Sequence, residues 1–228
     1  MNFTPIRLHA AFFLTNIDFS SKLNIATEVR AQAQNLLDVD PVLLPLPQDA
    51  PPEFPHIVIK NEKNGWAFQI APGRFDLVLD SSAQKAPTNL DEASERLYAV
   101  ALNIWKGLEN RFGARSNRLA SVIAIASQVD NAPEIVRQRY LNLRYGAGAY
   151  QSQVHILHKV ETEGFNLNRM IRLITLPEEK DSPSRLLMEV DVNTLAERPL
   201  IVTDANANSF FQLANRQTKE ACSLYLAE

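Results

Sequence analysis

Two heptapeptides that share one pattern constrain the fold of this chain more than any other feature. Arg74–Asp80 reads RFDLVLD and residues 185–191 read RLLMEVD. Both begin with Arg, end with Asp and carry apolar residues at the second, fourth and sixth positions, and they lie 111 residues apart (185 − 74). An alternation with a period of two is typical of a strand with one buried face. The repeat therefore predicts an equivalent strand in each half of the chain.

Each heptapeptide closes a similar series of predicted elements, which we assign from apolar periodicity and from turn and cap residues. In the first half they are a strand over 5–18, a helix from Ser20 or Ser21 to about Leu37, strands over 56–60, 66–71 and 74–80, and a helix over 90–112. In the second half they are a strand over 118–129, a helix over 133–143, strands over 150–160, 165–176 and 185–191, and a closing helix from Thr203 or Asp204. Both halves thus read strand, helix, three strands, helix.

This order predicts an internal duplication, with residues 1–113 and 114–228 as two pseudo-repeat halves of one compact domain. A shift of 111 residues also lays Leu8 on Leu119, Phe12 on Ile123 and Leu14 on Ile125. The alternative is that any meander followed by a helix gives such a pattern without a repeat.

Hairpin-linked strands with helices outside the meander predict an α+β fold with a largely antiparallel, curved sheet and the long helices on its convex face. This topology is similar to the TATA-binding-protein-like and helix-grip folds. The opposite face then carries apolar residues, namely Phe13, Val78, Val122 and Leu187. Contiguous apolar surface of that kind usually marks an interface or a ligand groove. The alternative is that the two halves pack their sheets face to face, which would make these residues core.

Length, net charge and cysteine count limit the partners and the compartment that we expect for this protein. The chain has 228 residues, a net charge of −3 and a single cysteine, Cys222. The near balance of charge gives no indication of non-specific binding to nucleic acid or to an anionic membrane. A single cysteine excludes an intramolecular disulfide. We interpret Cys222 as a small core residue and not as a catalytic thiol. We found neither a leader sequence nor a transmembrane segment, so we expect a cytoplasmic protein that has no membrane partner.

Two further features of the first half concern its structure and carry no predicted binding or catalytic residue. Residues 38–55 hold six of the thirteen prolines, which favours an extended connector on the surface. In the helix before it, periodicity turns Glu28 outward with its polar neighbours.

The stretch over 137–150 is the most function-like part of the sequence. It interleaves arginine with tyrosine, and its candidate binding residues are Arg137, Arg139, Tyr140, Arg144 and Tyr145. Such residues can pair with phosphates and stack on bases, and Gly146 and Gly148 would let backbone amides approach an anion. This indicates an RNA- or nucleotide-binding module. The alternative is an amphipathic helix whose arginines are solvated or paired with acidic residues.

Paired carboxylates give a weaker hypothesis of a hydrolase. Asp76 and Asp80 would share one strand face, as would Glu189 and Asp191 on the repeated strand, and paired carboxylates serve in glycosidases and aspartyl-type dyads. Aspartates at strand ends more often begin a turn.

No motif predicts a metal or a cofactor. His155 and His158 are the only close histidine pair, and their odd spacing on a strand sends them to opposite faces. We found no phosphate-binding loop, dinucleotide fingerprint or zinc motif.

The order of elements resembles a sporadically distributed bacterial family of uncharacterised proteins. The similar features are the opening strand, the apolar strand ending in Asp over 187–191, and a closing helix with Phe210, Phe211 and Tyr225. The resemblance implies no activity. The sequence as a whole favours a non-enzymatic binding or assembly protein that associates with itself or with a protein partner through the helix-free sheet face.

Overall fold

The computed structural model describes residues 3–47, 49–83, 89–141, 151–176 and 183–226. Its elements in the first half are β1 (Thr4–Asn16), α1 (Lys22–Gln32), β2 (Val42–Leu43), β3 (Ile57–Asn61), β4 (Trp66–Ala71), β5 (Arg74–Asp80) and α2 (Leu90–Phe112). Those in the second half are β6 (Arg115–Gln128), α3 (Ala132–Tyr140), β7 (Gln153–Thr162), β8 (Phe165–Leu176), β9 (Arg185–Thr194) and α5 (Asp204–Leu226).

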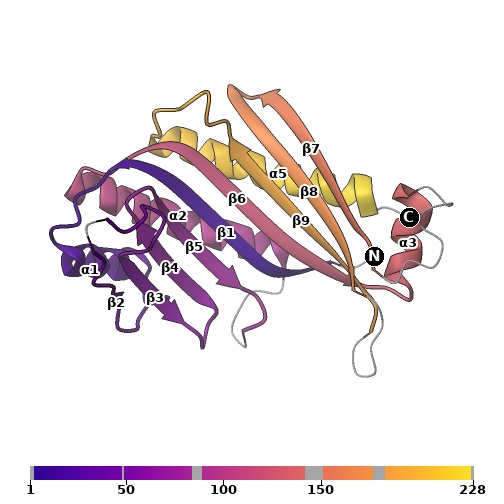
Figure 1. Ribbon diagram of the computed structural model, residues 1–228, viewed down its shortest axis with the longest axis horizontal. Helices are drawn as coiled ribbons and strands as arrows, with labels where there is room; N and C mark the ends of the chain where they lie inside the picture. The colour runs from indigo at the N-terminus through magenta and orange to yellow at the C-terminus, as the bar shows by residue number, and fades with distance from the viewer. Residues whose placement is uncertain (1–2, 48, 84–88, 142–150, 177–182, 227–228) are drawn as a thin grey trace.

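All strands join one sheet in the order β2-β3-β4-β5-β1-β6-β9-β8-β7, and every neighbouring pair is antiparallel. The long strands β1 and β6 lie together at its centre (Figure 1). Outward from this pair the two sides mirror each other, β5-β4-β3 on one side and β9-β8-β7 on the other. The predicted α+β class is therefore confirmed, and the halves form a continuous sheet. The alternative of two sheets packed face to face is wrong.

The repeated heptapeptides occupy matching places, because β5 lies beside β1 and β9 lies beside β6. The fixed offset of 111 does not extend to the central strands. Arg74 pairs with Phe13 and Arg185 pairs with Gln128, so these partners differ by 115 residues (128 − 13). The predicted superposition of the opening strands is thus wrong by four residues. Because four is even, the shift leaves each side chain on its expected face.

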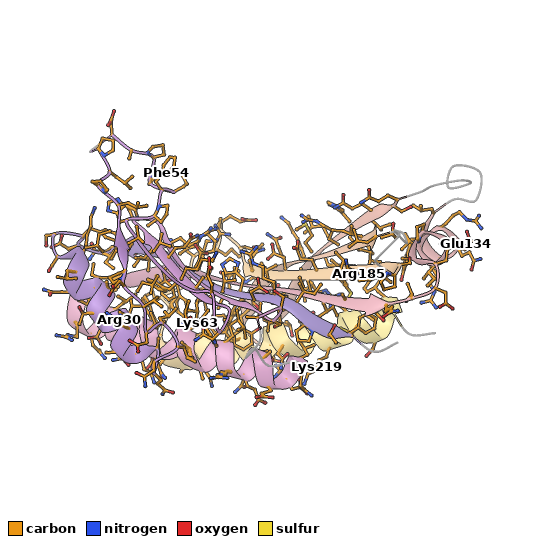
Figure 2. The ribbon with its side chains drawn as sticks, turned by 90° about the horizontal axis from the view of Figure 1, so that it is seen from below. Arg30, Phe54, Lys63, Glu134, Arg185 and Lys219 are labelled. Atoms are coloured by element: carbon orange, nitrogen blue, oxygen red, sulfur yellow. The ribbon has the colours of Figure 1, made fainter. Side chains whose placement is uncertain are left out.

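Helices α1, α2 and α5 pack on one face of the sheet (Figure 2), where the core forms. Phe12 of β1 stacks on Phe75 of β5 and on Trp105 of α2, with ring centroids 4.6 and 5.1 Å apart. It also contacts Phe211 of α5 at 5.6 Å. All four side chains are almost fully buried. This aromatic cluster joins elements of both halves into one core.

The long helix α2 begins and ends at the residues predicted from the sequence. The Asn89 side chain accepts hydrogen bonds from the amides of Asp91 and Glu92, and Gly113 ends the helix in the left-handed conformation with φ of 62°. A polar N-cap and a glycine just past the last turn are the local signals for such a helix.

Helix α1 departs from prediction in two ways. It ends at Gln32 and does not continue to Leu37, because Gln34 and Asn35 adopt positive φ. Glu28 is buried rather than exposed. It pairs with Arg111 of α2 at a point where Gly107 has no side chain to separate the helices, so that a Cβ there would lie 2.7 Å from the Glu28 carboxylate.

The proline-rich connector does more than link two elements. Its residues Val42 and Leu43 form β2, which pairs with β3 and so covers part of that edge of the sheet. Farther along, the segment around Phe54 projects from the side of the sheet opposite the helices (Figure 2). Residues 52–55 of this segment, which we call the proline-rich wall, lie beside the helix-free face.

Candidate functional site

The four predicted interface residues all lie on the helix-free face of the sheet. Phe13, Val78, Val122 and Leu187 come from β1, β5, β6 and β9, and each is half-buried. Val78 and Val122 sit directly across from His9 on its two neighbouring strands. The structure thus brings two of the four together around one histidine, while Phe13 and Leu187 lie level with opposite ends of β6.

Two hollows open on this face over the first half of the chain. The larger has a volume of about 520 Å³ and is lined by β3, β4 and β5 together with Arg7 of β1. The smaller, about 270 Å³, lies between Phe13 and the proline-rich wall, where Pro52 and Pro55 close it. Gln69 and Asp76 line both hollows. They mark the ridge at which the two meet.

A buried carboxylate and a histidine form the polar centre of this site. Asp76 Oδ1 lies 2.6 Å from His9 Nε2, and the exposed fractions of the two side chains are 5% and 22%. The other carboxylate oxygen, Oδ2, accepts from Gln69 Nε2 at 3.1 Å and from Arg74 Nε at 2.9 Å. Donors from three strands therefore converge on one acidic group.

Burial by itself raises the pKa of Asp76, but the hydrogen bond and charge of His9, the amide of Gln69 and the charge of Arg74 outweigh it and leave this pKa below its ordinary value. An ionised carboxylate only accepts hydrogen bonds, so Nε2 of His9 carries the proton that it donates to Asp76. The pair can hold an imidazole in a fixed orientation toward the helix-free face. The cross-strand neighbours of His9 are Val78 and Val122, so no hydroxyl or thiol stands at these positions to act as a nucleophile.

Sequence reasoning missed this pair. His9 and Asp76 are 67 residues apart, and they lie on a diagonal, because His9 is directly opposite Val78 and Asp76 is directly opposite Ala11. A diagonal contact depends on the strand register, which the sequence pattern alone does not set. The only local signal was the polar residue on each strand at a place where the face otherwise reads as apolar.

Phe13 lies between two guanidinium groups. It is the direct cross-strand partner of both Arg74 and Arg118. The Cζ atoms of these arginines lie 5.7 and 4.3 Å from the ring centroid, within the range of cation–π attraction. Arg118 is also held by a bond from Nε to the carbonyl of Thr194 on β9. The row therefore offers a flat aromatic surface with positive charge on two sides.

The paired carboxylates do not converge as a hydrolytic dyad requires. Asp80 and Glu189 lie in one row of the sheet, linked through Arg7 and Ala124. Three strand spacings of about 4.8 Å separate them by about 14 Å, whereas the two carboxyl groups of glycosidases lie about 5–9.5 Å apart. Glu189 instead pairs with Arg172 at 2.9 Å.

The carboxylate of Asp191 accepts a hydrogen bond from the Asn193 side chain. Each of the carboxylates Asp76, Glu189 and Asp191 thus has its own local partner.

The arginine- and tyrosine-rich stretch is only partly within the described residues. Arg137 pairs with Glu134 of the same helix, and the hydroxyl of Tyr140 donates to the backbone carbonyl of Tyr225 on α5. Arg139 lies on the same helix, while Arg144 and Tyr145 fall outside the described residues. Tyr140 thus connects α3 to α5, whereas Arg137 pairs within its own helix.

Other titratable groups add no second site. Within the described ranges no three His, Cys, Asp or Glu side chains gather in a way that would hold a metal ion. His158 bonds to the hydroxyl of Tyr225, while His155 is exposed on the other face of β7. Cys222 is half-buried, and its burial raises the pKa of the thiol to about 11, which is opposite to the shift of a reactive cysteine.

The described helices include none with the length and apolar character needed to cross a membrane. Comparison of the chain with protein-family models, with curated proteins and with solved structures gave no match.

Proposed function

We propose that this protein is a non-enzymatic binding protein that receives a protein partner on the helix-free face of its sheet. The observation that carries the proposal is the pair of hollows over the first half, which share Gln69 and Asp76, the buried carboxylate that His9 contacts. Binding sites are typically concave and mostly apolar, with a few fixed polar groups that orient the ligand. This face has both properties.

The apolar part of the face supports a macromolecular partner. A sheet face that is merely solvated alternates to polar residues, yet Val78, Val122 and Leu187 are apolar and half-buried. Interface cores are rich in aromatic residues and arginine. The Arg74–Phe13–Arg118 row has this composition and borders the smaller hollow.

The proline-rich wall bounds the binding face at one end. The segment from Pro52 to Pro55 closes the smaller hollow on one side, and it projects away from the helices (Figure 2). A partner that lies along the sheet would contact this wall at one end and reach Val122 near the centre. Proline limits the backbone freedom of such a wall, so less entropy is lost on binding.

The test compares charge substitutions on this face with the same substitution elsewhere. Val122→Arg and Leu187→Arg place a cation on the helix-free face, while Leu224→Arg makes the same change at an exposed leucine of α5. The tagged proteins are incubated with lysate of the cells from which the chain comes, and captured proteins are quantified by mass spectrometry. We expect Val122→Arg to lower capture of the partner at least tenfold, as loss of a central contact does, and Leu224→Arg to leave it unchanged.

Sedimentation velocity at micromolar concentration completes the experiment by separating a foreign partner from a second copy of the chain. The proposal is wrong if no captured protein depends on Val122 or Leu187. A partner whose capture falls steeply with added salt, and is destroyed by ribonuclease, would instead favour the RNA-binding alternative.

A further inference from the structure

The two outer edges of the sheet differ in how much backbone they leave open. One edge ends with β2, which has only two residues, Val42 and Leu43. The other edge is β7, which has ten residues, and Figure 1 shows no strand outside it. An open edge presents a row of backbone donors and acceptors that can pair with another strand. The long edge is therefore the more capable of binding a chain.

The register of the β7–β8 hairpin shows which backbone groups are open. Its turn, Glu163-Gly164, has positive φ at both positions (50° and 81°), as a two-residue type I′ turn requires. At the far end the amide of Thr175 donates to the carbonyl of Ser152 at 3.0 Å. Residues with even numbers thus bond to β8, and those with odd numbers point their backbone groups outward. The outward residues are Gln153, His155, Leu157, Lys159 and Glu161.

These outward residues carry exposed side chains on the helix-free face. Leu157, at the centre of the strand, is 64% exposed. Among the described residues no backbone bond beyond the strand ladder is made by the outward groups of β7. Natural sheets usually shield a long edge with a proline, a bulge, a covering segment or charged side chains. Strand β7 carries the charged residues Lys159 and Glu161, but it has no proline and pairs with β8 through ten consecutive residue pairs without a register shift.

We propose that two copies of this chain associate by antiparallel pairing of their β7 strands about a two-fold axis at His158. In this register His155 lies opposite Glu161, and Leu157 lies opposite Lys159. Both pairs consist of outward residues, so each can form the two backbone bonds of an antiparallel hydrogen-bonded pair. The two-fold axis makes the contact self-complementary, because each pair occurs twice.

Side-chain chemistry selects a second copy as the occupant. On the helix-free face the imidazole of His155 can donate to the carboxylate of Glu161, and the aliphatic stem of Lys159 can cover Leu157. On the other face Ile156 meets Val160. Moving the axis to Leu157 would place His155 opposite Lys159 and Gln153 opposite Glu161, which loses the carboxylate partner. Of these two registers, only the one about His158 gives His155 a carboxylate partner.

This contact lies at the edge of the second half and does not involve the hollows of the first half. It therefore stands apart from the proposed binding face, and the two can be tested separately. A contact of one strand buries little area, so we expect a weak dimer with a dissociation constant on the order of micromolar.

A charge swap tests both the edge and the register. Sedimentation velocity and light scattering measure the dimer of the full chain from one to several hundred micromolar. Glu161→Lys places a cation opposite His155, and His155→Glu places an anion opposite Glu161. Because each change acts in two symmetric pairs, we expect each single variant to weaken the dimer about tenfold. The double variant His155→Glu/Glu161→Lys restores an opposite-charge pair and should return the dissociation constant to within about threefold of the original.

The matched control is Glu95→Lys, the same change of charge at an exposed position of α2, which should leave the dimer unchanged. Circular dichroism checks that every variant keeps the fold. A chain that stays monomeric at all concentrations overturns the proposal, as does a dimer that is indifferent to the charge swap. A dimer lost in Val122→Arg but not in Glu161→Lys would assign self-association to the sheet face, which overturns the edge contact and leaves the proposed binding face intact.

Discussion

The two halves of this molecule share one order of elements but present different surfaces. In the first half the outer strands have five, six and seven residues, the edge is partly covered by β2, and the free face is hollowed around Asp76. In the second half the outer strands have ten, twelve and ten residues, and no other described strand pairs with the outer edge of β7. On its free face Arg172 and Glu189 pair across strands.

The difference shows how one topology can support two kinds of contact. Short strands leave room for a connector to rise beside the sheet, and so they create a concave site. Long strands give the sheet a longer row of backbone groups at its edge. The core that both halves share is formed by β1, β6 and the two long helices. The outer strands can therefore differ between the halves without changing this core.

The largest expected effect tests whether the halves are one unit. Phe12→Ala removes the ring that contacts Phe75, Trp105 and Phe211. We expect it to lower the free energy of unfolding by about 3–5 kcal/mol. Because the cluster spans both halves, urea unfolding followed by circular dichroism should remain a single transition. Two separate transitions would mean that the halves fold independently.

A second test compares the hairpin glycines of the two halves. Gly65 has φ of +77°, and a Cβ there would lie 2.1 Å from the backbone carbonyl oxygen of Asp80; Gly164 has φ of +81° with nothing within 4 Å. We expect Gly65→Ala to cost about 3 kcal/mol from strain and overlap together, and Gly164→Ala about 1 kcal/mol from strain alone. Chemical denaturation measures both. Equal costs would contradict the close approach at Gly65.

A third test compares the carboxylates of the two free faces. Asp76→Asn places an amide among three donors in a buried site, and we expect a loss of about 2 kcal/mol. Glu189→Gln affects a half-exposed ion pair, for which we expect less than about 1 kcal/mol. The two free energies of unfolding at neutral pH check this. A larger cost at Glu189 would reverse the contrast between the halves.

The smallest effect is a difference in acid sensitivity. The pKa of Asp76 is held below its ordinary value of 3.8 in the folded state. Its contribution is therefore fully present above the unfolded pKa and is lost as pH falls through the folded pKa. Asp76→Asn should thus lose less stability than the parent chain as pH is lowered below about 4. Thermal melts at several pH values between 2 and 6 measure this, and identical pH profiles would contradict it.

Local patterns predicted most of the fold. Apolar alternation located β4, β5 and β8, and the helix predicted over 90–112 has the bounds of α2. Contacts between elements that are distant in the chain could not be predicted from the sequence. Glu28 was expected on the surface because periodicity reports the face of one helix, whereas its burial arises from the close approach of α2 at Gly107.

The candidate site was predicted only in part, for a related reason. The helix-free position of Val122 follows from the period of two. The His9–Asp76 pair depends on strand register, and the register of β6 against β9 differs by four residues from that of β1 against β5. No pattern within a single strand contains that information.

The placement of the tryptophans has a practical consequence. The chain has two tryptophans, Trp66 and Trp105, and both belong to the first half, where each is almost fully buried. Indole emission therefore reports solvent entry around Trp66 and around the shared aromatic cluster at Trp105, whereas far-ultraviolet dichroism averages over both halves. One denaturation can be followed with both signals. Superimposable curves mean that unfolding of β7–β9 also exposes the indoles to solvent, and diverging curves show which part of the molecule unfolds first.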